Sequence, residues 1–217
     1  MQTVIVVVGL AFEARIVAAT GAHVICSGDG HNLAASLARA ISKDCRGLIS
    51  FGVAGGLLPG LSAGTCVVGS EIQFGALRFI TDPNWSPSLL HAIPAALYGK
   101  IVGVSAPIAY PFAKRVLFAD SGAVAVDMES HIAASAAAAS NLPFAAIRVI
   151  TDPAERTLPK IALAAVRPNG AVNIAAMIGS AMDHPGELRA LLQTTLDAFA
   201  AHATLRRVRQ ALGSVLD

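Results

Sequence analysis

Charged residues are scarce in this chain of 217 residues: they make up 14% of it, against about 25% in an average soluble protein, whereas hydrophobic residues make up 54%. The formal net charge is only +2, and the basic residues form no cluster before Arg206, Arg207 and Arg209. This balance argues against nucleic acid as a partner, because nucleic-acid-binding domains carry a strong basic patch. The apolar content indicates extensive burial, and we expect part of it to lie in a homo-oligomer interface, most simply that of a homodimer.

Long apolar runs are also absent. The runs at residues 4–9 and 144–147 are far shorter than the roughly 18 residues that a membrane-spanning helix requires. No basic segment with a cleavage site precedes the first run, so we expect no secretion signal. The three cysteines lack CxxC spacing and are odd in number, which is typical of reduced thiols in a cytoplasmic protein. They are Cys26, Cys45 and Cys66.

Several motifs of familiar chemistry are missing. The six histidines show neither HExxH nor HxH spacing, and no set of cysteines and histidines has the intervals of a zinc site. We therefore predict no metal site. The chain also lacks a GxSxG nucleophile elbow and a Walker sequence, which argues against the common serine hydrolases and nucleoside triphosphatases.

Short runs rich in Val and Ile alternate with segments of helical period, an order typical of α/β layering around a mainly parallel sheet. The strand candidates are residues 3–9, 22–28, 47–56, 65–70, 77–80, 100–104, 123–127 and 144–151, and the helix candidates include residues 12–20, 31–41 and 130–140. From about residue 158 the chain reads as helices, interrupted at residues 167–170 and 184–186. The length and the lack of an earlier linker predict one domain over residues 1–217.

Two glycine-rich segments follow strand candidates. SGDGHN, at residues 27–32, opens a helix, where free backbone N–H groups favour an anion such as phosphate, although a glycine after a strand more often marks a simple turn. Leu33 stands where a dinucleotide-binding fingerprint requires a third small residue, which argues against that fingerprint. FGVAGG, at residues 51–56, either lets the backbone approach a ligand closely or forms a tight turn.

Two acidic clusters, VDMESH at residues 126–131 and RVITDP at residues 148–153, place carboxylates where strands end. Ligands bind at such strand ends in open α/β sheets. In a regular strand Arg148 and Asp152 share a face, so they either address one pocket or belong to a structural ion pair. Glu129 directly precedes an alanine-rich helix, whose dipole favours its ionised form. It suits a group that accepts hydrogen bonds from ligand hydroxyls, or one that caps the helix.

The segments GLAFEA, SGDGHN, ISFGVAGGLLPGLSAGTCVV, VAVDMES and NLPFAAIRVITDPA, in this order, resemble methylthioadenosine/adenosylhomocysteine nucleosidases and the related purine nucleoside phosphorylases. The resemblance spans about residues 4–155. It implies a three-layer α/β/α fold with a central mixed, mainly parallel sheet, and cleavage of the bond between a purine and a ribose. The C-terminal part resembles more particularly the phosphorylases of bacterial hopanoid biosynthesis, whose proposed substrate is adenosylhopane.

The resemblance implies a role for several residues. Asp152 would protonate the purine N7, and Glu129 and Met128 would hold the ribose. These roles suit the chemistry, because cleavage of the C1′–N9 bond leaves positive charge on the sugar and negative charge on the base. To act as an acid near neutral pH, Asp152 needs a raised pKa, which burial would supply. The remaining substrate-binding residues implied at the base and the strand end are Ala54, Gly55, Ile108, Arg148 and Thr151.

The sequence departs from the nucleosidase pattern at two points. Nucleosidases of this group carry two adjacent glutamates, the second of which activates water, whereas this chain has Glu13 followed by Ala14 and Arg15. Val53 replaces a loop serine. We therefore favour phosphorolysis, with inorganic phosphate as co-substrate and no other cofactor. The predicted phosphate ligands are Arg15, Gly28, Gly30 and His31, and Glu13 stays a candidate base.

Two alternatives stay open. The first is a hydrolytic nucleosidase of the methylthioadenosine/adenosylhomocysteine type. The second is a protein that keeps the fold and binds a nucleoside or a lipid without catalysis, because a fold does not prescribe a function. The hopanoid resemblance also leaves open a lipid-linked nucleoside as the ligand and peripheral contact of a cytoplasmic protein with the membrane, to which the arginines near the C-terminus could contribute.

Overall fold

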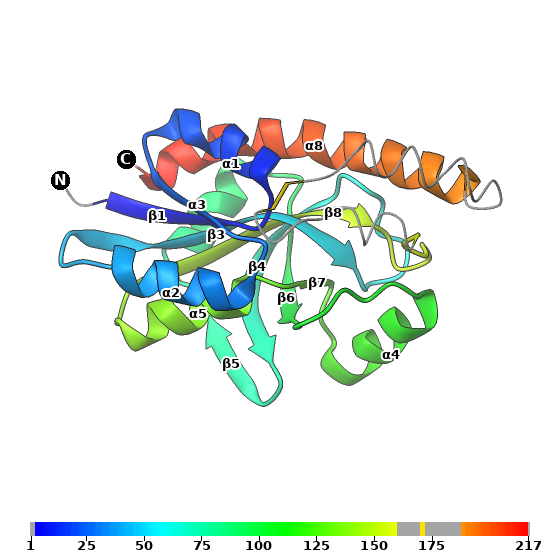
Figure 1. Ribbon diagram of the computed structural model, residues 1–217, viewed down its shortest axis with the longest axis horizontal. Coiled ribbons are helices and arrows are strands. Elements are labelled where there is room, and N and C mark those ends of the chain that lie inside the picture. The colour runs from blue at the N-terminus through cyan, green and yellow to red at the C-terminus, as the bar shows by residue number, and fades with distance from the viewer. Residues whose placement is uncertain (1–2, 160–169, 172–187, 217) are drawn as a thin grey trace.

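The computed structural model describes residues 3–159, 170–171 and 188–216 (Figure 1). Its strands are β1 (Thr3–Val8), β2 (His23–Cys26), β3 (Cys45–Gly56), β4 (Cys66–Phe74), β5 (Leu77–Ile80), β6 (Leu97–Gly103), β7 (Ala125–Asp127) and β8 (Phe144–Asp152). Its helices are α1 (Ala11–Val17), the 3₁₀ helix η1 (Ala18–Thr20), α2 (Gly30–Ala40), α3 (Trp85–Ala92), α4 (Pro111–Ser121), α5 (Ser130–Ala139) and α8 (Leu188–Leu216).

The eight strands form one mixed sheet that is mainly parallel. Parallel pairs join β1 to β2 and β3, β3 to β8, β4 to β6, and β6 to β7, whereas β7 pairs antiparallel with β3, and β4 pairs antiparallel with β5 and β8. The hydrogen-bonded path β3–β8–β4–β6–β7 therefore returns to β3 and closes a ring of strands. β1 and β2 extend the sheet from this ring on one side, and β5 extends it on the other.

Helices cover both faces of the extended sheet. β1 shows why, because alternate side chains of a strand point to opposite faces: Val4, Val6 and Val8 join one core cluster, and Ile5 and Val7 join another. The first cluster includes side chains of α1, α3 and α8, and the second includes side chains of α2 and α5. In Figure 1, accordingly, α1 and α8 lie above the sheet and α2 and α5 lie below it. The predicted three-layer α/β/α fold is confirmed.

Most predicted elements are present, with shifted ends. β5 has the predicted bounds, β4 runs beyond its predicted end, and α5 matches the alanine-rich helix candidate. The prediction contained neither α3 nor α4. Of the helices predicted after residue 158, α8 is observed, whereas residues 160–169 and 172–187 lie outside the described part of the chain. None of the helices in the described part is long and apolar enough to cross a membrane.

Candidate active site

A cavity of about 620 Å³ lies where β1, β7 and β8 end and β3 passes beside them. Most of the predicted site residues line it: Glu13, Gly28, Gly30, Ala54, Gly55, Ile108, Met128, Glu129, Thr151 and Asp152. Asp29 and Asp127 line it as well, so the lining is rich in carboxyl groups. Among the described residues that line this cavity there is no lysine, arginine or histidine.

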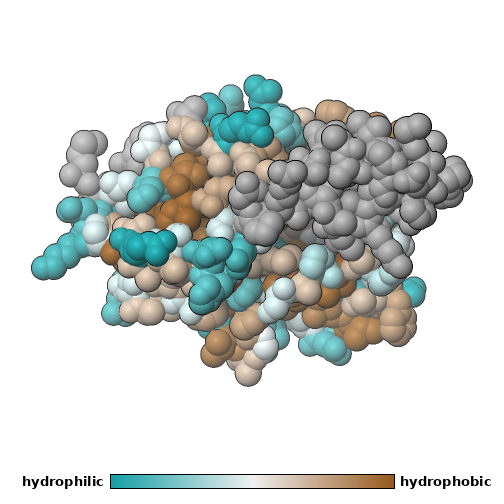
Figure 2. Space-filling model, in the orientation of Figure 1, coloured by the Kyte–Doolittle hydropathy of each residue, from teal (hydrophilic) through white to brown (hydrophobic). Residues whose placement is uncertain are grey.

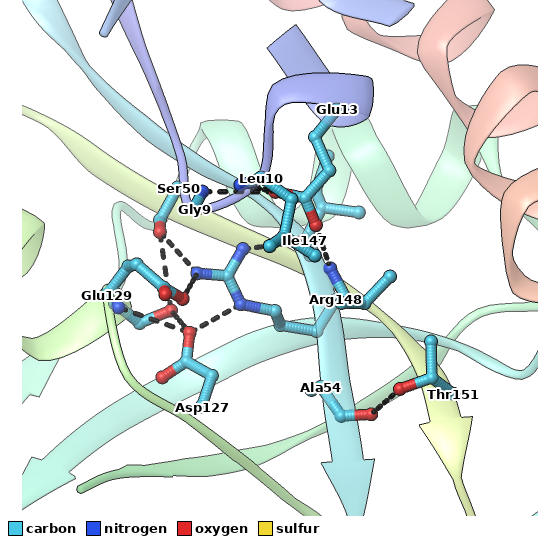
Figure 3. Close-up of polar contacts among 12 residues, drawn as sticks. Gly9, Leu10, Glu13, Ser50, Ala54, Asp127, Glu129, Ile147, Arg148 and Thr151 are labelled. Atoms are coloured by element: carbon cyan, nitrogen blue, oxygen red, sulfur yellow. Dashed lines mark hydrogen bonds and ion pairs between the residues drawn. The ribbon is translucent and has the colours of Figure 1, made fainter. Parts of the chain in front are cut away.

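Glu13, in the first turn of α1, has its carboxylate buried at one end of this cavity. Its Oε2 accepts hydrogen bonds from the backbone N–H groups of Gly9 at 3.0 Å and Leu10 at 2.8 Å, and its Oε1 accepts one from Val53 at 2.8 Å (Figure 3). Burial raises the pKa of Glu13, against the opposing effects of the Arg148 charge and of these hydrogen bonds. A carboxylate with a raised pKa is a better proton acceptor near neutral pH.

Behind the cavity, Arg148 is the centre of a buried polar cluster (Figure 3). Its Nε donates to Asp127 Oδ2, its Nη2 donates to Ser50 Oγ at 2.7 Å, and Nη2 lies 3.8 Å from Glu129 Oε2. Asp127 Oδ2 also accepts a hydrogen bond from the backbone N–H of Ser130 at 3.1 Å, at the start of α5. Asp127 therefore holds Arg148 and satisfies an N–H group of the first turn of α5, which is the capping role that the sequence offers for Glu129.

The surroundings of Glu129 oppose the ionisation that its position before α5 favours. Its side chain makes no capping hydrogen bond. Burial, followed by the charge of Asp127, raises the pKa of Glu129 to about 8, although Arg148 acts in the opposite direction. Desolvation and a neighbouring carboxylate therefore outweigh the helix dipole, so that near neutral pH the side chain has a proton to donate as well as oxygens that accept.

Asp152, at the end of β8, has a cationic partner that the sequence analysis did not identify. Lys114 Nζ on α4 lies 2.7 Å from Asp152 Oδ2, and the Lys114 side chain is fully buried. The hydroxyl of Thr151 donates to Asp152 Oδ1 at 3.0 Å. Burial raises the pKa of Asp152, whereas Lys114 and Thr151 lower it. No sequence signal marks Lys114, since lysines are almost never fully buried.

Three glycines allow the backbone to approach the site carboxyl groups. A Cβ atom at Gly9 would lie 2.5 Å from Glu129 Oε1, one at Gly52 would lie 2.6 Å from Glu13 Oε1, and one at Gly55 would lie 3.1 Å from Asp152 Oδ2. The structure therefore supports one of the two interpretations of the FGVAGG segment, close approach of the backbone. The groups that this backbone approaches are carboxyl groups of the protein itself, those of Glu13 and Asp152.

Arg148 is a predicted substrate-binding residue that the cavity does not include. Its guanidinium is engaged with Asp127 and Ser50, so Arg148 belongs to a structural ion pair, although its partner is Asp127 and Asp152 pairs with Lys114 instead. The predicted sharing of a face by Arg148 and Asp152 assumed a regular strand. In the structure the pairing of β3 with β8 shifts register between Ala54 and Gly55, directly opposite the end of β8.

Arg15 and His31, predicted to bind phosphate with Gly28 and Gly30, do not line the cavity. Arg15 is two residues after Glu13 on α1, and such residues point about 200° apart around a helix. Because Glu13 faces the cavity, Arg15 faces away from it, toward a separate hollow lined also by Arg206, Arg207 and Arg209. The predicted set of phosphate ligands is therefore not brought together.

The Gly28–Gly30 turn lines the cavity, yet its helix N-terminus is already capped. The Asp29 carboxylate accepts hydrogen bonds from the backbone N–H of His31 at 2.9 Å and from Asn32 Nδ2 at 2.8 Å. An added anion would have to displace this carboxylate or lie close to its charge. Elsewhere, no group of three or more His, Cys, Asp or Glu side chains in the described part of the chain is placed to hold a metal ion.

The chain belongs to the phosphorylase superfamily, whose family model matches residues 6–182. Among solved structures it is similar to the 5′-methylthioadenosine/S-adenosylhomocysteine nucleosidase of Neisseria meningitidis in complex with methylthio-immucillin-A, with a TM-score of 0.72, 19% identity and coverage of 99% of this chain and 100% of that one. It is also similar to the futalosine hydrolase of Helicobacter pylori strain 26695, with a TM-score of 0.72, 15% identity and coverage of 100% and 97%. A comparison with curated protein sequences finds no match.

Proposed function

We propose that this protein cleaves the N-glycosidic bond of a purine nucleoside. The observation that supports this is the division of the cavity's acids into two groups. Asp152 interacts with Lys114 at the end of β8, whereas Glu13 and Glu129 both contact Gly9, and the charge of Glu13 contributes to the raised pKa of Glu129. This cleavage requires an acid for the departing base and carboxyl groups for the sugar, because negative charge develops on the base and positive charge on the sugar as the bond breaks.

For the nucleophile, we propose water activated by Glu13 rather than phosphate. Glu13 lies in the cavity with a raised pKa, and the described lining has several acidic side chains and no basic one. A phosphate dianion at the N-terminus of α2 would lie close to the Asp29 carboxylate, and none of the described lining residues supplies a basic side chain to compensate. In the hydrolytic reaction, a water oxygen bonds to C1′ as the C1′–N9 bond breaks. Glu13 takes the proton of the water, and Asp152 gives a proton to the purine.

Phosphorolysis, which the sequence favoured, is the second candidate. Its support is the position of Gly28 and Gly30, whose backbone lines the cavity at the N-terminus of α2. Binding of phosphate there would require the Asp29 carboxylate to turn away from the His31 N–H group.

The substrate that we propose is an adenine nucleoside with an apolar 5′ substituent, of which adenosylhopane is the case suggested by the C-terminal sequence. Apolar side chains share the cavity lining with the carboxyl groups, and they suit a substituent of this kind. They include Leu10, Val104, Pro107, Ile108 and Leu158.

Adenine release from 5′-substituted adenosines, measured with and without inorganic phosphate, tests the proposal. We expect the same rate in both buffers and a free ribose product. Glu13→Gln should lower kcat by about 10²- to 10⁴-fold, the usual contribution of a positioned base, whereas Glu71→Gln on β4, which pairs with Arg78 and does not line the cavity, should leave it unchanged. A ribose 1-phosphate product, formed only with phosphate, would establish phosphorolysis. Tight binding of the nucleoside without any release would identify a non-catalytic protein.

A further inference from the structure

Lys114 occupies a position that is unusual for a lysine. It lies on α4, its side chain is fully buried, and Nζ is surrounded by oxygen atoms from the end of β8 and the segment after it. It contacts Asp152 Oδ2 at 2.7 Å, Asp152 O at 3.1 Å, Pro153 O at 2.9 Å and Arg156 O at 3.3 Å. An ammonium group has three N–H donors, so this shell satisfies all of them. Burial of an unpaired ammonium is costly, and here the compensation comes from the predicted catalytic acid itself.

This contact makes the two oxygens of the Asp152 carboxyl group unequal. Oδ2 faces the ammonium of Lys114. Because a carboxyl oxygen that accepts a hydrogen bond from a cation is less readily protonated, the proton of Asp152 favours Oδ1 over Oδ2. Oδ1 is 3.0 Å from the hydroxyl of Thr151, which also lies 3.4 Å from the carbonyl oxygen of Ala54. The Thr151 hydroxyl can therefore donate to Oδ1 when Asp152 is ionised, and to Ala54 when Oδ1 carries a proton.

We propose that Lys114 is a positioning residue for the reaction, holding Oδ2 of Asp152 so that Oδ1 carries the proton delivered to the purine base. This inference rests on the proposed function. In the step, the Oδ1–H bond breaks as the N7–H bond forms, and the electron pair of the C1′–N9 bond stays with the base. Asp152 is left as a carboxylate beside the ammonium. Before the next turnover, Glu13 releases to the solvent the proton that it took from water, and Asp152 takes up one proton from the solvent.

Lys114 is placed to stabilise the charge that develops on Asp152 during this transfer. The ammonium is fixed before the reaction, so it does not need to reorganise as the proton leaves. The other charged groups near Asp152 are Arg156 and Asp197, which form an ion pair at 2.9 Å. Asp197 raises the pKa of Asp152 slightly, in the opposite direction to Lys114. Lys114 is thus the cation that directly contacts the acid among the described residues.

The test is the pH dependence of kcat/KM in Lys114→Met. Asp152 must hold a proton to donate it, so activity is lost as the pH rises through the pKa of Asp152. Because Lys114 lowers this pKa, its removal should move the alkaline limb to higher pH by about one unit or more. At the optimum we expect kcat to fall by at least about 10-fold, with a much smaller change in KM.

Lys100→Met is the matched control. Lys100 also fixes α4, because its Nζ donates to the carbonyl oxygen of Ser121 at 2.9 Å, but it does not contact Asp152. Loss of a helix anchor alone should therefore lower the stability of both variants and leave the alkaline limb in place. If the limb of Lys114→Met coincides with that of the wild type, Lys114 is merely structural and the inference is wrong.

A measurement without turnover separates this inference from the proposed function. The ¹³C resonance of the Asp152 carboxyl group, assigned with Asp152→Asn, should titrate at a higher pH in Lys114→Met or Lys114→Gln than in the wild type. If neither variant folds, the Lys114 ¹⁵Nζ signal of the wild type should shift with the same midpoint as the Asp152 carboxyl carbon. Unrelated midpoints would overturn the inference. A wild type with coupled titrations but no base release would instead contradict the proposed function.

Discussion

The surroundings of the Asp152 carboxyl group determine its pKa, and therefore whether it can act as a proton donor. Burial raises its pKa, and the contact with Lys114 prevents the increase from being larger. A catalytic acid needs this balance, because a group that holds its proton too tightly is as ineffective as one that has already lost it.

Asp152→Asn tests the role of Asp152 as the general acid. We expect kcat on adenine nucleosides to fall by about 10²- to 10⁴-fold, equivalent to roughly 3 to 5 kcal/mol, because asparagine keeps the shape but cannot deliver a proton. Substrate affinity should change far less. A ribosyl nitrophenolate, whose leaving group needs no proton, is the control substrate, and the variant should recover most of its activity on it. Equal loss on both substrates would show that Asp152 is not the acid.

Glu129 makes the stability of the protein depend on pH. Its pKa of about 8 in the folded protein lies above the ordinary value of 4.5, so between these values the folded state keeps a proton that the unfolded chain has lost. The free energy of unfolding therefore falls as the pH rises through this window, by on the order of 1 kcal/mol per pH unit. Urea denaturation at pH 6, 7 and 8 should show a steeper fall for the wild type than for Glu129→Gln. Identical slopes would mean that Glu129 is not protonated in the folded state.

The residues that could be predicted are those whose role follows from a strand end. Asp152 ends β8 and Glu13 follows β1, and because both strands run parallel to β3 their ends come together. Glu129 also follows a strand end, but β7 runs antiparallel to β3. Arg15 is predicted as a phosphate ligand because it follows the position of the missing second glutamate, but on α1 it points away from the cavity that Glu13 faces. Lys114 is 38 residues from Asp152 in the sequence, and only the packing of α4 on the end of β8 joins them.

At the scale of the elements, the strands were the easiest to predict because residues buried on both faces form unbroken Val- and Ile-rich runs. The prediction missed α3 and α4, which have weaker signals. α3 contains Pro87, which disguises its helical period, whereas α4 begins with Pro111 and ends at Gly122 in the left-handed conformation. Proline at a helix start and glycine just beyond its end are recognised signals, so α4 was accessible to prediction.

The ring of strands could not be predicted from the pattern of apolar residues. Its closure depends on β7, a strand of three residues that pairs with β3 only through Gly55 and Gly56. Such a short pairing leaves no trace in the periodicity of the sequence. The pairing of β7 with β3 nevertheless determines which residues form the site, because it brings Asp127 and the residues after it beside β3, where Glu13 and Asp152 also lie.

At the scale of the whole molecule, the low charge content leaves large apolar side chains exposed. Phe112 on α4 is 70% exposed, Tyr110 is 54% exposed and Val116 is 44% exposed, and Ile80 on β5 is 73% exposed. Apolar residues gather over α4 in Figure 2. Contiguous exposed apolar residues commonly mark an interaction surface.

We expect this surface of α4 to be buried between two copies of the chain, because two-fold homodimers are the commonest assemblies and use the same patch on both subunits. Sedimentation velocity at micromolar concentration should then show a dimer. Phe112→Asp should shift it toward the monomer, since each interface would bury two uncompensated carboxylates. Ala35→Asp, on the polar exposed face of α2, is the control and should leave the dimer intact. A wild-type monomer would contradict the expectation and would leave the apolar face of α4 available to a lipid-linked substrate or to the membrane.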